Sequence, residues 1–320
     1  MRGMASDTGL SERRLAIITL LMISFIIASS LVTTVPLPKY AIFKRPYLAL
    51  VKIEGPLAYS SEYTLLSTST GAEEYIELLK EVKNDPYARA VVLYVNSPGG
   101  TVSASEALYF AIKELAEKKI TVAYIAGYGT SGAYMAVLPS RRIIASNSSL
   151  AGSIGVYMVL INLKDLLGKV GIKAYIFKSG RLKDLGSPFR SLTEEEKEVL
   201  KGLVDEYFRL FKQRVLKYRK GLTNSSEVFQ GRPYLADEGK RLGLIDEVGT
   251  LHYALNIARN LSGLPEDCPV KVFKPRRLSL LELFLKSYGG ISCSTPSGEI
   301  LAMWPLPSPL PLRLLSNPPT

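Results

Sequence analysis

Short apolar runs alternate with amphipathic runs through the middle of the chain. Apolar and β-branched runs predict strands at residues 47–53, 90–95, 120–125, 142–145, 173–177 and 270–273. Helical spacing predicts helices at 72–82, 103–118, 132–138 and 162–170, a long helix from Thr193 to Arg219 closed by Gly221, and two shorter ones within 231–261. Strands and helices that alternate at this size predict an α/β fold with a mostly parallel sheet surrounded by helices.

One apolar stretch is different in kind. From Leu15 to Val35 the chain runs for 21 residues without a charge, and as a helix it would span about 30 Å, which matches a bilayer core. A cleaved signal peptide is the alternative, but its apolar region usually covers only about 7 to 15 residues, so the length favours a retained anchor. Basic residues stand on both sides of the stretch, so their count does not set its orientation.

These patterns divide the chain into an N-terminal flank (1–14), a transmembrane anchor (15–35), a stalk (36–46), a globular domain (47–274) and an extended C-terminal tail (275–320). The last 25 residues hold seven of the chain's 19 prolines, which excludes a regular helix or a central strand through most of them. Residues 278–285 are apolar enough for a short helix before that stretch.

Composition narrows the function. The net charge of +11 comes from scattered basic residues with no long basic run, which argues against nucleic-acid binding. The single histidine, His252, and the two cysteines, Cys268 and Cys293, offer no metal cluster, so we expect neither a metal nor another cofactor. Whether the two cysteines pair in a disulfide is left open.

Two small-residue motifs follow predicted strands, and loops at the carboxyl ends of parallel strands are where sites collect. Gly99 and Gly100 allow the backbone to approach a ligand closely, as an oxyanion site requires, although the motif Asn-Ser-Pro-Gly-Gly at 96–100 is also an ordinary turn sequence. Ser131 stands between a predicted strand and a predicted helix, where a serine acts either as a nucleophile or as an N-cap.

A serine nucleophile needs a general base, and the chain is poor in histidine. His252 lies in a helical stretch that gives it the character of an ordinary helix-face residue. A neutral lysine is the alternative base. Keeping a lysine of pKa near 10.4 neutral at pH 7 is worth up to roughly 4.6 kcal/mol, so a catalytic lysine must be buried in an apolar pocket.

Taken in order, these segments resemble the signal peptide peptidase A family, serine peptidase family S49, which has the ClpP/crotonase-like fold. The resemblance covers about residues 47–261 and rests on the motifs at 94–100, 131–134, 151–156, 178–184, 231–234 and 243–249. It implies Ser131 as nucleophile, Lys183 as general base with Lys178 as a rival, oxyanion donors at Gly99, Gly100 and Gly132, and Ser153 as the residue that orients the base. Ala133 departs from the second glycine that the family often has after the serine.

The resemblance further implies a homo-oligomeric, membrane-anchored serine endopeptidase with an extracytoplasmic catalytic domain, which degrades residual signal peptides and other hydrophobic or unfolded segments. The alternatives are a related protease that trims a stomatin-like membrane partner, a crotonase-like acyl-CoA enzyme and an inactive scaffold. The tail segment Leu301-Ala302-Met303-Trp304 is of the kind a peptidase groove would bind, so we consider it either as a regulatory or self-processing segment or as a plain tail.

Overall fold

The computed structural model describes residues 17, 19–22, 24, 45–60, 62–63, 68–223, 225–275 and 301–303. The chain divides into two units, Met1–Arg45 and Pro46–Thr320. Most of the predicted anchor, the apolar stretch 278–285 and Cys293 lie outside the described residues. Among the helices that are described, none has the length and apolar character needed to cross a bilayer.

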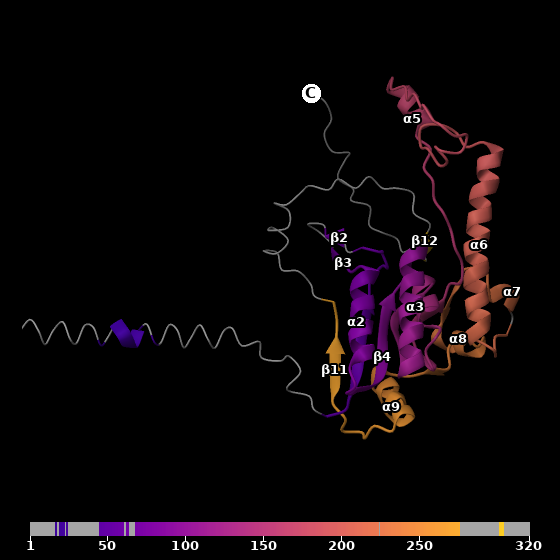
Figure 1. Cartoon of the computed structure of the whole chain (residues 1–320). Helices are drawn as coiled ribbons and strands as arrows, with labels where there is room; N and C mark the ends of the chain where they lie inside the picture. Colours follow the sequence, from indigo (N-terminus) through magenta and orange to yellow (C-terminus); the bar gives the residue numbers. More distant parts are fainter. Residues whose placement is uncertain are drawn as a thin grey trace, which may run out of the picture. The chain divides into compact units, whose positions relative to one another are not determined.

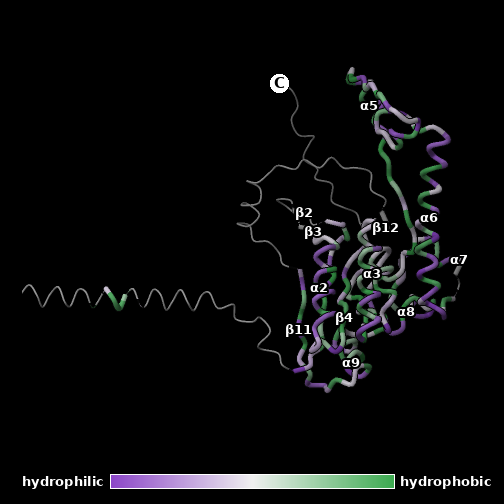
Figure 2. The backbone as a smooth tube through the Cα atoms, in the orientation of Figure 1, coloured by the Kyte–Doolittle hydropathy of each residue, from purple (hydrophilic) through white to green (hydrophobic). Residues whose placement is uncertain are grey.

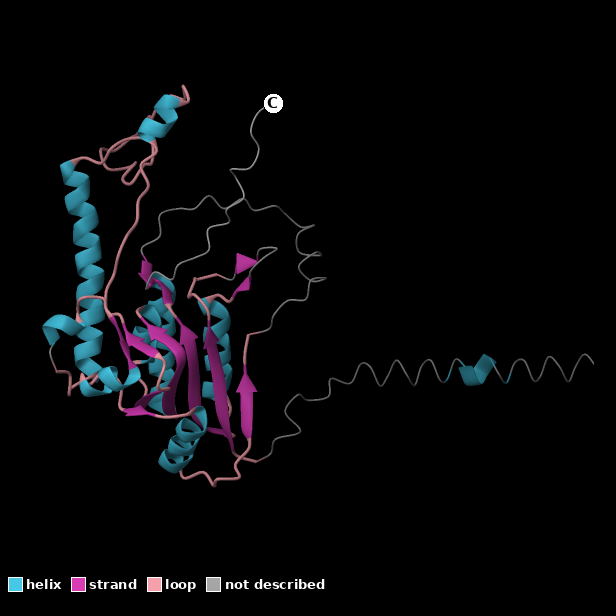
Figure 3. Ribbon diagram, turned by 180° about the vertical axis from the view of Figure 1, so that it is seen from behind, coloured by secondary structure: helices cyan, strands magenta, loops and turns pink. Residues whose placement is uncertain are grey.

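A mostly parallel sheet forms the centre of the second unit, as the sequence predicts (Figure 3). Its main path runs β10-β7-β6-β4-β1-β11, and every neighbouring pair on that path is parallel. The bounds of these strands are β1 Tyr47–Glu54, β4 Ala88–Ser97, β6 Ile120–Thr130, β7 Arg142–Ala145, β10 Glu247–Val248 and β11 Val270–Phe273. Two further strands extend it at one end: β8 (Leu150–Gly152) is parallel to β6, and β9 (Pro233–Leu235) is antiparallel to β8.

Helices cover both faces of the sheet (Figure 1). Successive side chains of a strand point to opposite faces, so Ala49 and Val51 of β1 join one core cluster and Leu48 and Leu50 join another. The first cluster includes side chains of α2 (Ala72–Asn84), α3 (Val102–Lys118) and α4 (Gly132–Val137). The second includes side chains of α9 (Leu251–Ser262). Burial on both faces explains why these strands read as nearly continuous apolar runs.

Residues 156–193 form a long excursion between β8 and α6 (Glu194–Tyr218), which we call the arm. It carries α5 (Lys164–Lys169), shorter than the predicted helix at 162–170. The strand predicted at 173–177 is wrong: these residues are irregular and exposed, Tyr175 by 79% and Phe177 by 95%. Among the described residues, no sheet edge or core packs against this apolar pattern. Figure 2 shows hydrophobic residues along the arm as well as in the sheet.

Short elements complete the unit. The long helix predicted from Thr193 forms as α6 and begins with a capping box of Thr193 and Glu196. The helical pattern at 231–261 becomes α8 (Ala236–Arg241) and α9. The others are α7 (Ser225–Val228), the hairpin of β2 (Glu62–Tyr63) with β3 (Thr68–Ser69), and the antiparallel pair of β5 (Gly99–Thr101) with β12 (Leu301–Met303).

Candidate active site

The two predicted motifs meet at the carboxyl ends of β4 and β6, as expected for neighbouring parallel strands. Ser97 pairs with Gly129 across the two strands. The Thr130 Oγ1 hydroxyl donates a hydrogen bond to the Pro98 carbonyl over 3.1 Å, and Thr130 is buried. Convergence of the Asn-Ser-Pro-Gly-Gly loop with the segment before Ser131 is therefore confirmed.

The glycines of the first motif are needed for close backbone packing. Gly99 has a φ of 99°, in the region that favours glycine. A Cβ added at Gly100 would lie 1.8 Å from the Leu57 carbonyl oxygen, so no other residue fits there without displacing the backbone. The Gly99 N–H donates to Ser97 Oγ over 3.2 Å. Gly100 is thus the part of this loop at which backbone lies against backbone.

Ser131 is held in a strained conformation at the start of α4. Its φ of 53° is positive, which is uncommon for a residue with a side chain and costs about 1–3 kcal/mol. Its N–H donates to the Gly152 carbonyl over 2.7 Å, and its own carbonyl accepts from the Met135 N–H over 2.9 Å. Ser131 occupies the N-cap position, but its hydroxyl makes no capping hydrogen bond. The surrounding backbone fixes the position of this serine, and its hydroxyl does not cap the helix.

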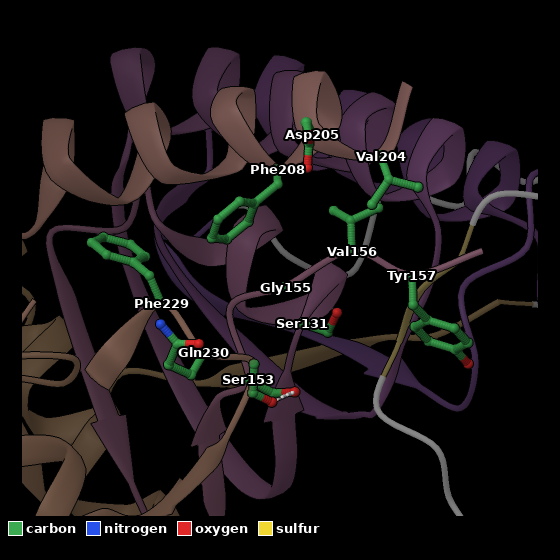
Figure 4. Close-up of a pocket in the computed structure, with 11 residues that line it drawn as sticks. Ser131, Ser153, Gly155, Val156, Tyr157, Val204, Asp205, Phe208, Phe229 and Gln230 are labelled. Carbon is green, nitrogen blue, oxygen red and sulfur yellow. Dashed lines mark hydrogen bonds between the residues drawn. The ribbon is translucent and has the colours of Figure 1, made fainter. Parts of the chain in front are cut away.

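Ser131 lines a cavity of about 360 Å³. Figure 4 shows Ser131 and Ser153 on one side of it and the α6 side chains Val204, Asp205 and Phe208 on the other. Phe229 adds to the apolar wall. A cavity of this size, with apolar walls and few polar groups, fits a side chain of a bound peptide or ligand.

Ser153 lies beside Ser131 in this cavity and is also strained, with a φ of 52°. Its Oγ donates to the Gly231 carbonyl over 2.9 Å, the dashed line in Figure 4, and its N–H donates to the Arg232 carbonyl over 3.0 Å. Two carbonyls therefore position Ser153. In this chain its hydroxyl proton is directed at Gly231 and not at a lysine.

Lys183 is not brought to Ser131 within one chain. It lies exposed on the arm, and its ammonium makes no hydrogen bond or ion pair with any described residue. Among the described residues that line the cavity there is neither a lysine nor a histidine. His252 lies exposed on α9, where its Nε2 is 3.1 Å from the Asn256 amide nitrogen.

An ion-pair network surrounds Lys183 without including it. Asp184 pairs with Lys178 and with Arg190 at 2.6 Å each, and Arg190 also bonds Glu196 at the start of α6. Hydrogen bonds from Arg190 and Lys178 lower the pKa of Asp184 well below its usual range. Asp205, the α6 residue that lines the cavity, lies about 13 Å from Glu196 along the helix axis. Lys178, the rival base, is engaged as an ion-pair partner.

Sequence reasoning missed the far wall of the cavity. Val204, Asp205 and Phe208 belong to a helix whose amphipathic pattern is visible, but their place opposite Ser131 depends on how the arm returns α6 to the body. It also missed the Gly152 carbonyl, which accepts the hydrogen bond of the Ser131 N–H, because any residue type supplies such a backbone carbonyl. Among the described residues no group of three or more His, Cys, Asp or Glu could hold a metal ion.

Comparison with known proteins gives this geometry a context. The sequence model described as Peptidase family S49 matches residues 113–265, and the one described as Clp protease matches residues 66–151. A provisionally named protease of Methanocaldococcus jannaschii is 41% identical over 194 residues, which cover 60% of this chain and 62% of that protein. A provisionally named protease of Synechocystis sp. is 32% identical, over 70% of this chain and 77% of that protein.

A protein of Enterococcus faecium, provisionally named signal peptide peptidase SppA, is 32% identical over 64% of this chain and 61% of its own length. This chain therefore spans about three fifths of the Methanocaldococcus and Enterococcus relatives. A solved structure of a mutant 1510-N membrane-bound stomatin-specific protease aligns with a TM-score of 0.46 and 12% identity, over 73% of this chain and 100% of that one. The matched motifs and relatives, on a parallel sheet that joins the two strand-end loops, show that the chain belongs to peptidase family S49.

Proposed function

We propose that this chain is a serine endopeptidase in which Ser131 is the nucleophile and Lys183 of a neighbouring copy is the general base. The observation that carries the proposal is that one chain keeps the candidate nucleophile and the candidate base apart. The strained Ser131 faces a cavity whose described lining residues include no basic side chain, while Lys183 lies exposed on the arm. A second copy that inserts its arm supplies what the cavity lacks.

The chemistry requires a neutral lysine. Lys183 Nζ takes the proton of Ser131 Oγ as that oxygen attacks the substrate carbonyl carbon. N–H groups at Gly100 and Gly132 face the developing oxyanion, and Ser153 turns its hydroxyl from Gly231 to orient the amine. The protonated lysine gives its proton to the leaving amine as the C–N bond breaks, and water then hydrolyses the acyl ester. Gly99 contributes to the shape of the loop, because its own N–H is bonded to Ser97.

Association also supplies the burial that lysine needs. Val204, Phe208 and Phe229 line the cavity, and an ammonium group moved among them loses its hydration, which lowers its pKa. The arm carries exposed apolar side chains that a homo-oligomer would cover: Val159, Ile161, Val170, Ile172 and Phe177. This supports an assembly in which the arm is the contact between copies.

The apolar cavity and the names of the relatives support residual signal peptides and other hydrophobic or unfolded segments as substrates. We propose that residues 15–35 anchor the protein in the cell membrane as a single pass, with the catalytic domain outside the cytoplasm. The 21 uncharged residues of that stretch are the support for the anchor.

Co-expression of two inactive chains tests the central claim. Ser131→Ala and Lys183→Ala, each alone, should lose at least about 1,000-fold in hydrolysis of an unstructured peptide. A co-assembled mixture of the two should recover about a quarter of the parent activity, because random assembly pairs an intact serine with an intact lysine at one site in four. Lys178→Ala is the matched control and should retain most activity.

A mixture that stays inactive, although the two chains co-purify, would show that serine and lysine act within one chain. Full activity in either single variant would contradict the proposed function itself. An unchanged urea-denaturation midpoint in Lys183→Ala, compared with the parent, separates loss of the base from loss of the fold.

A further inference from the structure

The C-terminal tail returns to the candidate site. Its strand β12 pairs antiparallel with β5, with Leu301 opposite Thr101, Ala302 opposite Gly100 and Met303 opposite Gly99 (Figure 1). The intervening 25 residues, 276–300, separate this strand from the body in sequence. A segment from the far end of the chain therefore lies on the loop that carries the candidate oxyanion glycines.

The other edge of β5 is already occupied. The Leu57 N–H donates to the Gly99 carbonyl over 2.8 Å, and the Thr101 N–H donates to the Leu57 carbonyl over 2.8 Å. Backbone groups alternate in direction along a strand, so the N–H and carbonyl of Gly100 point to the opposite edge. Ala302 is the residue that β12 places at that edge.

This edge is where an extended peptide would lie during hydrolysis. β5 contains Gly99 and Gly100 and packs against α4, the helix that begins directly after Ser131. Addition of a strand to a free sheet edge is a general way to bind a peptide, because the backbone hydrogen bonds do not depend on its sequence. The absence of a Cβ at Gly100 allows the Leu57 backbone to lie close against β5.

We propose that Leu301–Met303 is a built-in competitor that occupies the peptide-binding edge of β5, so that the full chain inhibits itself until a substrate or another factor displaces the strand. This rests on the proposed peptidase function. The residues suit the role: they are uncharged and apolar, like the substrates proposed for this site. The pairing favours a regulatory segment over a plain tail.

The tether sets the strength of the inhibition. A tether of 25 residues brings the strand to β5 at an effective concentration in about the millimolar range, whereas a three-residue strand binds weakly by itself. The balance gives inhibition of about tenfold, which a substrate at high local concentration can overcome.

A proline substitution in the full chain tests the competition. Ala302→Pro removes the N–H that faces the Gly100 carbonyl and should raise kcat/KM for an unstructured peptide by about tenfold. Ser308→Pro is the matched control, since it adds a proline to the same tail outside β12, and it should leave kcat/KM unchanged.

Hydrogen exchange gives a second readout that needs no activity. In a Ser131→Ala background the Gly100 amide should exchange faster when Ala302→Pro is added, and not when Ser308→Pro is added. Unchanged exchange would overturn the proposal. Faster exchange with unchanged kcat/KM in the active chains would also overturn it, because the strand would bind without competing. If no version hydrolyses peptides, the proposed function fails, while exchange still reports whether the strand occupies β5.

Discussion

The cavity around Ser131 and the arm that carries Lys183 are built on different principles. Ser131 is 1% exposed and its N–H is tied to a carbonyl of β8 in the core of the sheet. On the arm, Phe177 is 95% exposed and Lys183 has no side-chain partner among the described residues. Within one chain the position of the candidate nucleophile is thus fixed by the core, whereas the side chain of the candidate base is held by no described contact.

The interactions within each region explain the difference. Around Ser131, side-chain hydroxyls donate hydrogen bonds to backbone carbonyls far away in sequence, Thr130 to Pro98 and Ser153 to Gly231. In the arm, Asp184 pairs with Lys178 and with Arg190, each six residues away, and Arg181 pairs with Glu195, 14 residues away. Local pairs hold a loop in shape without fixing where it lies relative to the sheet. The arm is therefore suited to be positioned by a second copy.

Glycine substitutions should give the largest difference in activity between a change near Ser131 and a change on the arm. Gly100→Ala should lower kcat/KM by about 100-fold, roughly 2.7 kcal/mol, because its Cβ would push the Leu57 carbonyl and β5 away from Ser131. Gly180→Ala on the arm is the control, since no described atom lies within 4 Å of its added Cβ. Steady-state kinetics on one peptide measure both. Equal losses would mean that the body is no more constrained than the arm.

Tyrosine hydroxyls test the same contrast through stability. Tyr134 is fully buried and donates to the Leu244 carbonyl over 2.7 Å, so Tyr134→Phe leaves that carbonyl unsatisfied. The expected cost is about 1–3 kcal/mol of unfolding free energy. Tyr175→Phe, at a side chain that is 79% exposed, should change it by less than about 0.5 kcal/mol. Urea denaturation compares the two, and a Tyr175→Phe change as large as that of Tyr134→Phe would place the arm in a packed environment.

The sequence predicts the body far better than the arm, for a physical reason. Strands such as residues 47–53 and 120–125 read clearly because both of their faces are buried. The convergence of the loop at 96–100 with the segment before Ser131 follows from the positions of both at the ends of neighbouring parallel strands. By contrast, the apolar pattern at 173–177 predicts a strand that does not form, because a pattern does not tell which surface covers it.

Long-range placement accounts for the rest of what was missed. The role of Phe208 as a cavity wall depends on the return of α6 from the arm, and the pairing of Ala302 with Gly100 depends on a tail that comes back to the site. The identity of Ser131 and Lys183 as candidates came from motif order. Their separation within one chain is information that only the structure adds.

Lowering the pH should give the smallest effect, and one that acts on the arm but not on the surroundings of Ser131. Hydrogen bonds from Arg190 and from the Thr193 N–H lower the pKa of Glu196 to about 2, against about 4.3 for a free glutamate. Because the pKa of Glu196 is lower in the folded state, its stabilisation is complete above the pKa of a free glutamate and is lost as the pH falls toward the pKa of the folded state.

Protection of residues 178–196 in hydrogen exchange, corrected for intrinsic rates, should therefore hold from pH 8 to about pH 5 and fall a few-fold between about pH 4 and pH 2. The Ser131 amide, bonded to a carbonyl that does not titrate, should keep its protection over the first part of that range. Arg190→Gln should give low arm protection at every pH. An arm that responds to acid equally with and without Arg190 would show that this network does not hold the loop around Lys183.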